Sequence, residues 1–357
     1  MRPSWHPDSL ADRAGFLRRR ALLTQATRAF FAARGATEVE TPYAVRAPGE
    51  EVHLQAFATE RLSPTGAREK LWLNTSPEFA MKRLLVAGAG PIFQLARVWR
   101  NGEHSDLHAP EFTMLEWYRP GADFAALLAE TESFLRAVLP PVVSCRGITT
   151  SLAHFQRLTM QEAFARYAGA DLLGTLEDAA ALAASAGATR RPGETWEDLF
   201  FRLLLERIEP QIGRACPTFL THWPAPQAAL AVRDPADPRV ALRVELYVCG
   251  LELANGFEEL TDAGEQRSRF EADRARRHAI GGPDWPLDED FLASLAHGMP
   301  PACGIALGFD RLAMIASGAD RIDQVLWLPE PEPERVSPVF SVRVSTSDVP
   351  MEPIPHA

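Results

Sequence analysis

Cysteine is scarce in this chain, and its spacing excludes two kinds of site. Four cysteines occur among 357 residues, at positions 145, 216, 249 and 303. None of them forms a Cys-x-x-Cys pair, so neither a zinc knuckle nor a disulfide framework is supported. The sequence also lacks an apolar run long enough to cross a bilayer, and it lacks the apolar core of a signal peptide. These absences predict a protein of the reducing cytoplasm without a membrane segment.

Positive charge is also in short supply. The chain carries 47 acidic and 37 basic residues, which gives a formal net charge of −10. Because nucleic-acid phosphates attract basic surfaces, this balance argues against bulk DNA as a partner, although it permits a local basic groove. With 46% hydrophobic residues, the chain is long enough to bury a large core in one large domain or two smaller ones.

Helical and strand-like segments are mixed without regular alternation. Helical patterns are predicted at 9–35, 77–87, 123–139, 159–168, 177–186, 195–208 and 264–279. Strand-like runs are predicted at 38–42, 71–74, 92–100, 111–119, 241–248 and 251–257. Clusters of strands interrupted by helical blocks predict an α+β fold on an antiparallel sheet, in which the runs 92–100 and 111–119 form a hairpin.

The ends of the chain are expected to differ from its body. Residues 1–8 are expected to be an N-terminal extension, and residues 9–329 a single catalytic domain. Residues 329–357 carry seven prolines and no helical periodicity. Such a composition predicts that 330–357 is a disordered or surface-draped tail.

The octet Gly304 to Arg311 places very small residues at alternate positions. On a strand, Gly304, Ala306 and Gly308 would share one face and leave it bare. A helical pattern follows and puts Arg311 on its first turn. A bare strand with a cation beside it suits a flat ring with phosphates, such as a nucleotide. It suits a tightly packed strand–helix junction equally well.

Acidic residues in an apolar segment form a second group. Residues 245–259 are strand-like throughout, and Glu245 and Glu252 are seven positions apart, so a regular strand would put them on opposite faces. A bulge at Gly250 would bring both to one side. Buried carboxylates require a compensating cation, either Mg²⁺ with nucleotide phosphates or neighbouring arginines. The alternative is an edge strand with solvated acids, which the apolar neighbours disfavour.

Two further candidates lie in the predicted hairpin. Arg100 ends its first strand beside the loop, where an arginine can hold a phosphate bidentately, and the alternative is a surface arginine. On the return strand, the carboxylates of Glu111 and Glu116 near Tyr118 are expected to share a face and hold an amine.

Residues 76–78 form a short motif whose local explanation is structural. The sequence Ser-Pro-Glu gives a serine cap, a proline at the first helical position and an acid in the first turn, which is a standard helix start.

Several of these segments together resemble the class II lysyl-tRNA synthetases. The matching stretches, in order, are Arg100-Asn101, Pro110 to Tyr118, Glu252 to Phe257 and Gly304 to Arg311. The resemblance is closer to their shortened paralogues, the family of elongation factor P lysine ligases, because of residues 75–78, 81–84 and 117–120. It covers roughly residues 9–329.

The resemblance implies a fold and a reaction. The fold is an antiparallel sheet flanked by helices, usually dimeric through the segment ending at Pro42. In the reaction, the carboxylate of (R)-β-lysine or lysine attacks the α-phosphorus of ATP and forms an aminoacyl-adenylate. A lysine side chain of the acceptor, elongation factor P, then attacks the activated carbonyl. The implied cofactors are ATP and Mg²⁺, and catalysis of the first step is expected to be positional and electrostatic.

The resemblance also implies roles for individual residues. Arg100 and Arg311 would clamp phosphates as the catalytic pair. The implied ATP contacts are Arg100, Asn101, Gly102, Glu103, Ala109, Glu245, Leu246, Gly308 and Arg311. The implied amino-acid contacts are Ser76, Pro77, Glu78, Tyr118, Glu252, Asn255, Glu259 and Ala306. Glu245 and Glu252 would hold Mg²⁺ or meet the substrate amine, and Glu78 and Glu259 suit a cationic substrate.

Two features favour the ligases over the tRNA-charging enzymes. Only about forty residues precede Pro42, which leaves no room for an anticodon-binding barrel, so no anticodon contact is expected. Ala306 stands where the tRNA-charging enzymes have glycine. Its methyl group takes space beside the α-carbon of the substrate and favours an amine on the β-carbon, by about 1–3 kcal/mol.

The chain also departs from the synthetase pattern. Gly102 stands where the family has glutamate, with Glu103 one place later, and Ala109 replaces an asparagine. Both positions contact ATP in the family. The alternatives are an enzyme that charges lysine onto tRNA or a small molecule, and a catalytically inactive regulatory subunit. The retained arginines and acids disfavour the inactive subunit.

Overall fold

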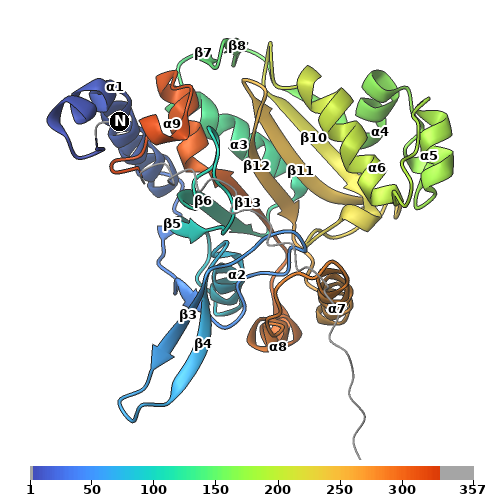
Figure 1. Ribbon diagram of the computed structural model, residues 1–357, viewed down its shortest axis with the longest axis horizontal. Coiled ribbons are helices and arrows are strands. Elements are labelled where there is room, and N and C mark those ends of the chain that lie inside the picture. The colour runs from blue at the N-terminus through green and yellow to red at the C-terminus, as the bar shows by residue number, and fades with distance from the viewer. Residues whose placement is uncertain (1–2, 330–357) are drawn as a thin grey trace, which may run out of the picture.

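The computed structural model describes residues 3–329, so the expected tail 330–357 lies outside the described residues (Figure 1). Its centre is an eight-stranded sheet in the order β1-β5-β6-β13-β12-β11-β10-β9. The bounds in that order are Thr37–Glu38, Ile92–Trp99, Glu111–Pro120, Ala302–Gly308, Leu251–Glu258, Val240–Val248, Thr218–Pro224 and Gln156–Thr159. The six central strands, from β5 to β10 in this order, pair antiparallel with one another. The edge strand β1 pairs in parallel with β5, and the edge strand β9 pairs in parallel with β10. The predicted α+β class and the 92–119 hairpin are confirmed.

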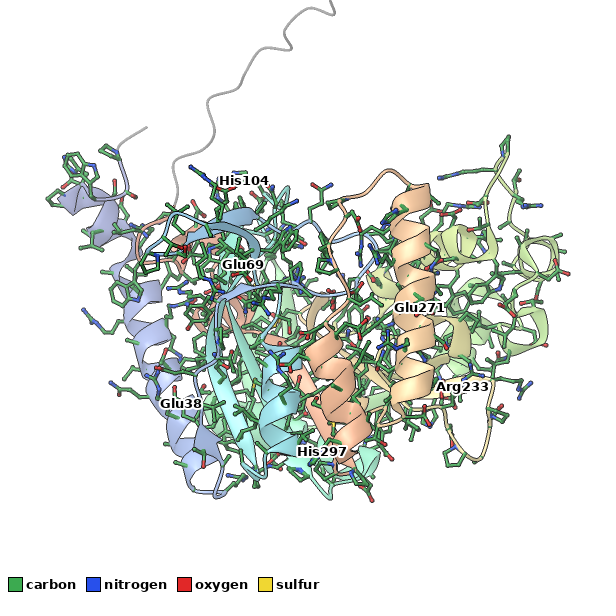
Figure 2. All side chains as sticks on the ribbon, turned by 90° about the horizontal axis from the view of Figure 1, so that it is seen from below. Glu38, Glu69, His104, Arg233, Glu271 and His297 are labelled. Atoms are coloured by element: carbon green, nitrogen blue, oxygen red, sulfur yellow. The ribbon has the colours of Figure 1, made fainter. Side chains whose placement is uncertain are left out.

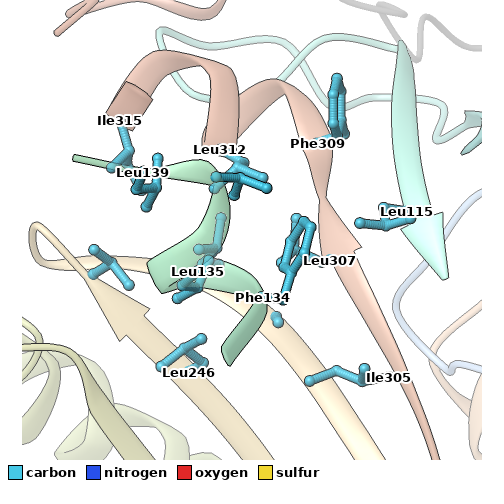
Figure 3. Packing of buried hydrophobic residues seen from close by; sticks show 14 of the residues in the cluster. Leu115, Phe134, Leu135, Leu139, Leu246, Ile305, Leu307, Phe309, Leu312 and Ile315 are labelled. Atoms are coloured by element: carbon cyan, nitrogen blue, oxygen red, sulfur yellow. The ribbon is translucent and has the colours of Figure 1, made fainter. Parts of the chain in front are cut away.

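One face of the sheet carries the largest core. The helices α1 (Pro7–Ala32), α3 (Phe124–Val138) and α9 (Phe309–Ser317) cover this face. Ile305 and Leu307 of β13 point into this core together with Leu246 of β11 (Figure 3). Because side chains alternate along a strand, Gly304, Ala306 and Gly308 face the other way. The expected bare face of the octet therefore lies opposite the core.

The other face is flanked by α2 (Glu78–Val86), α8 (Glu289–Gly298) and α7 (Ala263–Ala279), which lie side by side in that order (Figure 2). Tyr118 and Ile92 of the sheet pack with Met81 of α2 and Phe291 of α8 in a second core. Between these helices and the sheet lie the residues that form the candidate site.

Two smaller parts complete the chain. The helices α4 (Met160–Ala163), α5 (Ala179–Ser185) and α6 (Trp196–Leu203) form a cluster with its own core beside β10 and β11. α4 and α6 each continue into a π-helical turn, at Phe164–Ala168 and Leu204–Ile208. A three-stranded sheet of β2 (Ala44–Val45), β4 (Arg68–Leu73) and β3 (Ala58–Leu62) projects from the body (Figure 1), and β7 (Val142–Cys145) pairs with β8 (Ile148–Ser151).

The structure corrects the predicted start of the first helix. α1 begins at Pro7, two residues before the expected Ser9. The cause is an earlier cap, because Nδ1 of His6 accepts a hydrogen bond from the backbone N–H of Asp8, and Pro7 takes the first helical position. The same helix is tied to α9 by a buried ion pair between Arg20 and Asp310.

The structure confirms the two predicted runs 241–248 and 251–257 and places a turn inside the strand-like segment 245–259. The segment is a hairpin, in which β11 and β12 are joined at Cys249 and Gly250 with φ of 52° and 69°. Positive φ at both turn residues is typical of a tight hairpin turn. The expected bulge exists, but the register shifts between Leu246 and Tyr247 rather than at Gly250.

None of the helices within 3–329 combines the length and the apolar content that crossing a bilayer requires. The four cysteines are unbonded, and Cys145, Cys249 and Cys303 are buried.

Candidate active site

A cavity of about 750 Å³ opens on the face of the sheet opposite the main core. Sites for small molecules typically have volumes of roughly 300–1,000 Å³. The cavity is lined by segments that are far apart in sequence: the start of α2, the β5–β6 hairpin, the β11–β12 hairpin and the junction of β13 with α9. Eleven predicted residues line it: Ser76, Glu78, Arg100, Glu103, Ala109, Glu245, Glu252, Asn255, Ala306, Gly308 and Arg311.

Six predicted residues do not line the cavity of the described chain, namely Pro77, Asn101, Gly102, Tyr118, Leu246 and Glu259. Leu246 is fully buried in the main core, because its neighbour Glu245 points to the site and alternate residues of a strand face opposite ways. Tyr118 and Glu259 are buried beside the cavity. Asn101 turns away, and its backbone N–H donates to the carbonyl of Gln55 at 2.7 Å.

Arg311 is held in place at the cavity by two acceptors. Its Nη1 donates to the backbone carbonyl of Glu252 at 2.7 Å, and its Nη2 lies 2.7 Å from Nε2 of His108. Because a guanidinium only donates, Nε2 accepts and the proton of the neutral imidazole sits on Nδ1, which faces Ser105 Oγ at 2.8 Å. Burial and the charge of Arg311 lower the pKa of His108, which keeps it neutral. Our sequence analysis missed this histidine.

The contact between His108 and Arg311 predicts a loss of stability in mild acid. The pKa of His108 is lower in the folded protein, so below about pH 6.5 the unfolded chain gains a proton that the folded chain does not. The free energy of unfolding should therefore fall as the pH drops below that value. In His108→Gln, whose amide oxygen accepts from Arg311 without titrating, this fall should be smaller.

Urea unfolding of wild type and His108→Gln between pH 5 and 8 tests this expectation. His104→Gln in the same loop, an exposed position, is the matched control and should retain the wild-type dependence. Equal slopes for wild type and His108→Gln below pH 6.5 would contradict the proposed neutral acceptor.

Arg100 is prepared to receive an anion. Within residues 3–329 its Nε is buried and has no hydrogen-bond partner. The guanidinium lies over the ring of Phe112, with the carbon 5.2 Å from the ring centroid. Its nearest carboxylate is that of Glu103 at 3.9 Å. A buried donor without a partner is costly, so an incoming phosphate oxygen would satisfy it.

The two acids of the β11–β12 hairpin face the same cavity. Glu245 is buried and accepts hydrogen bonds from Arg243 Nη2 at 2.8 Å and from the Tyr247 hydroxyl at 2.8 Å. Burial and the charge of Glu252 raise the pKa of Glu245 to about 7. The cation that the sequence requires is thus Arg243, which stands two residues earlier on the same strand face. A period-two search of the strand would have found it.

The geometry of these two acids fits Mg²⁺ only with ligands from a bound phosphate. The described residues contain no group of three or more His, Cys, Asp or Glu side chains that could hold a metal ion. Glu252 is half-exposed, and its carboxylate lies 3.8 Å from Arg311. Mg²⁺ commonly binds one or two carboxylates together with phosphate oxygens and water, which is what this pair offers.

A buried polar cluster adjoins the cavity beside α2. Lys82 forms ion pairs with Glu78, at 2.6 Å, and with Glu259. Glu116 accepts hydrogen bonds from Ser76 Oγ at 2.6 Å and from the Tyr118 hydroxyl at 2.9 Å. We define these six residues as the acid cluster: Ser76, Glu78, Lys82, Glu116, Tyr118 and Glu259.

Burial governs the titration of this cluster. It raises the pKa of Glu116 to about 8, with help from the charge of Glu78. It also raises the pKa of Glu259 to about 8, although Lys82 opposes the shift. The expected second carboxylate near Tyr118 is not Glu111, which lies on the opposite face of β6 and accepts a hydrogen bond from Trp99 at 3.2 Å.

The octet is only partly a ligand floor. A Cβ atom at Gly304 would lie 2.2 Å from a ring carbon of Tyr118, so the side chain of Tyr118 itself occupies the bare strand there. The strand is open to the cavity from Ala306 to Gly308. The octet therefore combines tight packing at its first residue with cavity lining at its third and fifth, and a nucleotide on this strand stays a prediction.

Comparison with known proteins is consistent with this geometry. Residues 11–332 match the model of the family tRNA synthetases class II (D, K and N). The chain is 42% identical over 332 residues to the elongation factor P–(R)-β-lysine ligase of Hamiltonella defensa, covering 91% of this chain and 97% of that protein. It is 45% identical over 329 residues to the ligase of the same name from Edwardsiella ictaluri, covering 90% and 96%. It is 44% identical over 328 residues to the ligase of the same name from Haemophilus influenzae, covering 90% of this chain and 96% of that protein.

Proposed function

The chain belongs to the class II tRNA synthetases, among the elongation factor P–(R)-β-lysine ligases, and from this premise we propose that it activates (R)-β-lysine or lysine with ATP and transfers it to a lysine side chain of elongation factor P. One observation carries the proposal. A single cavity is lined by two arginines, Arg100 and Arg311, and also by the edge of the acid cluster.

The register of the sheet separates these two ends. Gly308 of β13 pairs with Met114 of β6, near Arg311, whereas Ala306 pairs with Glu116 of the acid cluster. ATP is proposed to lie over Gly308, and the amino acid over Ala306. Pro77, Asn101, Gly102 and Leu246 do not line the cavity, so their proposed contacts would be made by backbone groups.

The first step needs no nucleophile from the chain. The substrate carboxylate attacks the α-phosphorus of ATP, the bond to the β-phosphate oxygen breaks, and pyrophosphate leaves. Arg100 and Arg311 stabilise the negative charge on the transferring group and hold the two reactants in line. Glu245 and Glu252 would hold Mg²⁺, which supplies further neutralisation of the phosphates.

At the amino-acid end, the chain supplies groups that select a cationic substrate. Ser76 and Glu78 line the cavity, and Asn255 has a buried Oδ1 without a hydrogen-bond partner in the described chain. These oxygens would accept hydrogen bonds from substrate ammonium groups. The acceptor lysine then attacks the activated carbonyl, and AMP leaves.

The proposal includes a homodimer in the cytoplasm. α1 exposes Leu10 and Leu22, with 45% and 52% of their surfaces accessible. Exposed large apolar side chains on one helix support an interface with a second copy.

Ala306 is the proposed determinant of which lysine isomer is activated. Its side chain lines the cavity and lies between Asn255 and Glu116 on the neighbouring strands. Ala306→Gly removes the methyl group that disfavours an α-amine. We expect relative exchange rates to shift toward α-lysine by roughly 10- to 200-fold, the range for one added carbon in a pocket. Ala302→Gly on the same strand, away from the cavity, is the matched control and should leave the ratio unchanged.

The function itself is tested by ATP–pyrophosphate exchange with (R)-β-lysine and with α-lysine, followed by the intact mass of elongation factor P. The expected result is exchange and a mass increase of one lysyl group. Exchange without that increase would favour a tRNA or small-molecule acceptor, and no exchange with either isomer would refute the enzyme.

A further inference from the structure

The acid cluster contains its own ammonium group, although the proposed substrate also brings one. Lys82 is 1% exposed and sits one helical turn after Glu78 on α2. Its Nζ lies 2.6 Å from Oε1 of Glu78 and is ion-paired with Glu259. The two acids that the resemblance assigns to a cationic substrate are thus already bridged by the chain. The Oε1 atom of Glu259 has no hydrogen-bond partner among residues 3–329.

Lys82 leaves the cluster short of positive charge. Glu78, Glu116 and Glu259 supply three carboxyl groups, and Lys82 is the one basic side chain in the six-residue cluster. Of these three acids in the described chain, only Glu78 lines the cavity. An arriving ammonium group therefore meets the oxygen of Glu78 that Lys82 does not hold, next to the hydroxyl of Ser76. Glu116 accepts a hydrogen bond from that hydroxyl at 2.6 Å and so fixes its orientation.

We infer that Lys82 is a positioning residue that determines amino-acid specificity: by bridging Glu78 and Glu259 it fixes the carboxylate that receives the substrate ammonium. This inference rests on the proposed function. Lys82 acts through Glu78 and does not touch the substrate, because it is buried behind the cavity wall.

Other ionisable groups face the same cluster. Glu116 and Tyr118 come from β6, Glu259 follows β12, and Glu51 in the loop before β3 lies close enough to be affected by the charge of Glu78. All of these are acidic or phenolic, so within the cluster no other group replaces the positive charge of Lys82. Without it, the carboxyl groups of Glu78 and Glu259 lie next to each other with no cation between them, and the pair takes up a proton.

Kinetics of Lys82→Met separate this role from a structural one. In amino-acid-dependent exchange at pH 7, KM for lysine and for (R)-β-lysine should rise roughly 10- to 100-fold, the cost of losing a charged hydrogen bond. KM for ATP should change little. At pH 9 the pair releases that proton while the substrate ε-amine, with a pKa near 10.4, stays charged. The ratio of mutant to wild-type KM should then fall toward one.

Three variants complete the test. Lys82→Gln keeps a hydrogen-bond donor without the charge and should show the same dependence on pH, so it replaces Lys82→Met if that protein does not fold. Lys82→Arg keeps the charge, and its KM ratio should be independent of pH. Arg83→Gln, on the next position of α2 and paired with Asp288 outside the cluster, is the matched control and should behave as wild type.

The possible outcomes are distinguishable. A KM ratio for Lys82→Gln that is equal at pH 7 and pH 9, or a wild-type KM at pH 7, would overturn the inference. Adding Lys82→Met to Glu78→Gln should raise KM much less than in the wild-type background, and independent effects would also overturn it. If the wild-type chain shows no ATP–pyrophosphate exchange with either lysine isomer, the result refutes the proposed function rather than the role of Lys82.

Discussion

Arg311→Met should lower the rate of ATP–pyrophosphate exchange by about 10²- to 10³-fold, the loss that follows removal of one preorganised donor to developing charge. Arg311 is the side chain whose position the structure fixes most fully at the cavity, through His108 and the carbonyl of Glu252. Methionine fills a similar volume but donates nothing. The exchange rate of Arg311→Lys should lie between those of wild type and Arg311→Met. An ammonium keeps the positive charge but lacks the planar pair of donors of a guanidinium.

Steady-state exchange at varied ATP concentration measures this loss. The fall should appear in kcat, since the charge that Arg311 meets develops in the transition state. Arg157→Met on β9 is the control, because this arginine is about half-exposed, lies 4.0 Å from Glu132 and is remote from the cavity lining. A loss smaller than tenfold for Arg311→Met would contradict the role given to Arg311.

Arg20→Met should lower the free energy of unfolding by about 3–5 kcal/mol, the usual cost of removing one partner from a buried ion pair. The side chains of Arg20 and Asp310 are 7% and 2% exposed. Arg20 Nη2 also donates to Thr113 Oγ1 at 3.0 Å, and the Thr113 backbone N–H donates to Asp310 Oδ2 at 2.7 Å. Without Arg20, the charge of Asp310 stays buried and uncompensated.

Denaturant unfolding provides the measurement, and two variants provide its controls. Arg28→Met, on the same helix as Arg20, breaks an exposed ion pair with Glu38 of β1 and should cost less than about 1 kcal/mol. The double variant Arg20→Met with Asp310→Leu should be more stable than Arg20→Met alone, since it removes the unpaired charge. If the double variant is the less stable of the two, the loss is not electrostatic.

The regular parts of the fold could be predicted from the sequence because each has a local cause. Alternation predicted the hairpin of β5 and β6, and side-chain size predicted which face of β13 is open. The predicted runs 241–248 and 251–257 are β11 and β12, but the tight turn between them was missed, because Cys249 gives no turn signal and Gly250 was interpreted as a bulge. His6 as a cap was missed because histidine is not a preferred capping residue.

The site was predicted less evenly, because partners across the sheet carry no local pattern. The need for a cation beside Glu245 followed from burial, and Arg243 supplies it on the same strand. His108 could not be predicted, since its partner Arg311 is about two hundred residues away. The bridging of Glu78 by Lys82 was within reach, because residues four apart on a helix are neighbours.

The place of β13 between β6 and β12 has a consequence for the order of synthesis. β13 begins at residue 302 of 357, so both of its neighbours leave the ribosome long before it does. Until then their facing edges have free backbone donors and acceptors, which are a template for aggregation. Neither Ala306 nor Arg311 exists yet, so the nascent chain gains no stability from nucleotide. Completion of the sheet and the ability to bind ligand therefore arrive together, once β13 and the start of α9 have been synthesised.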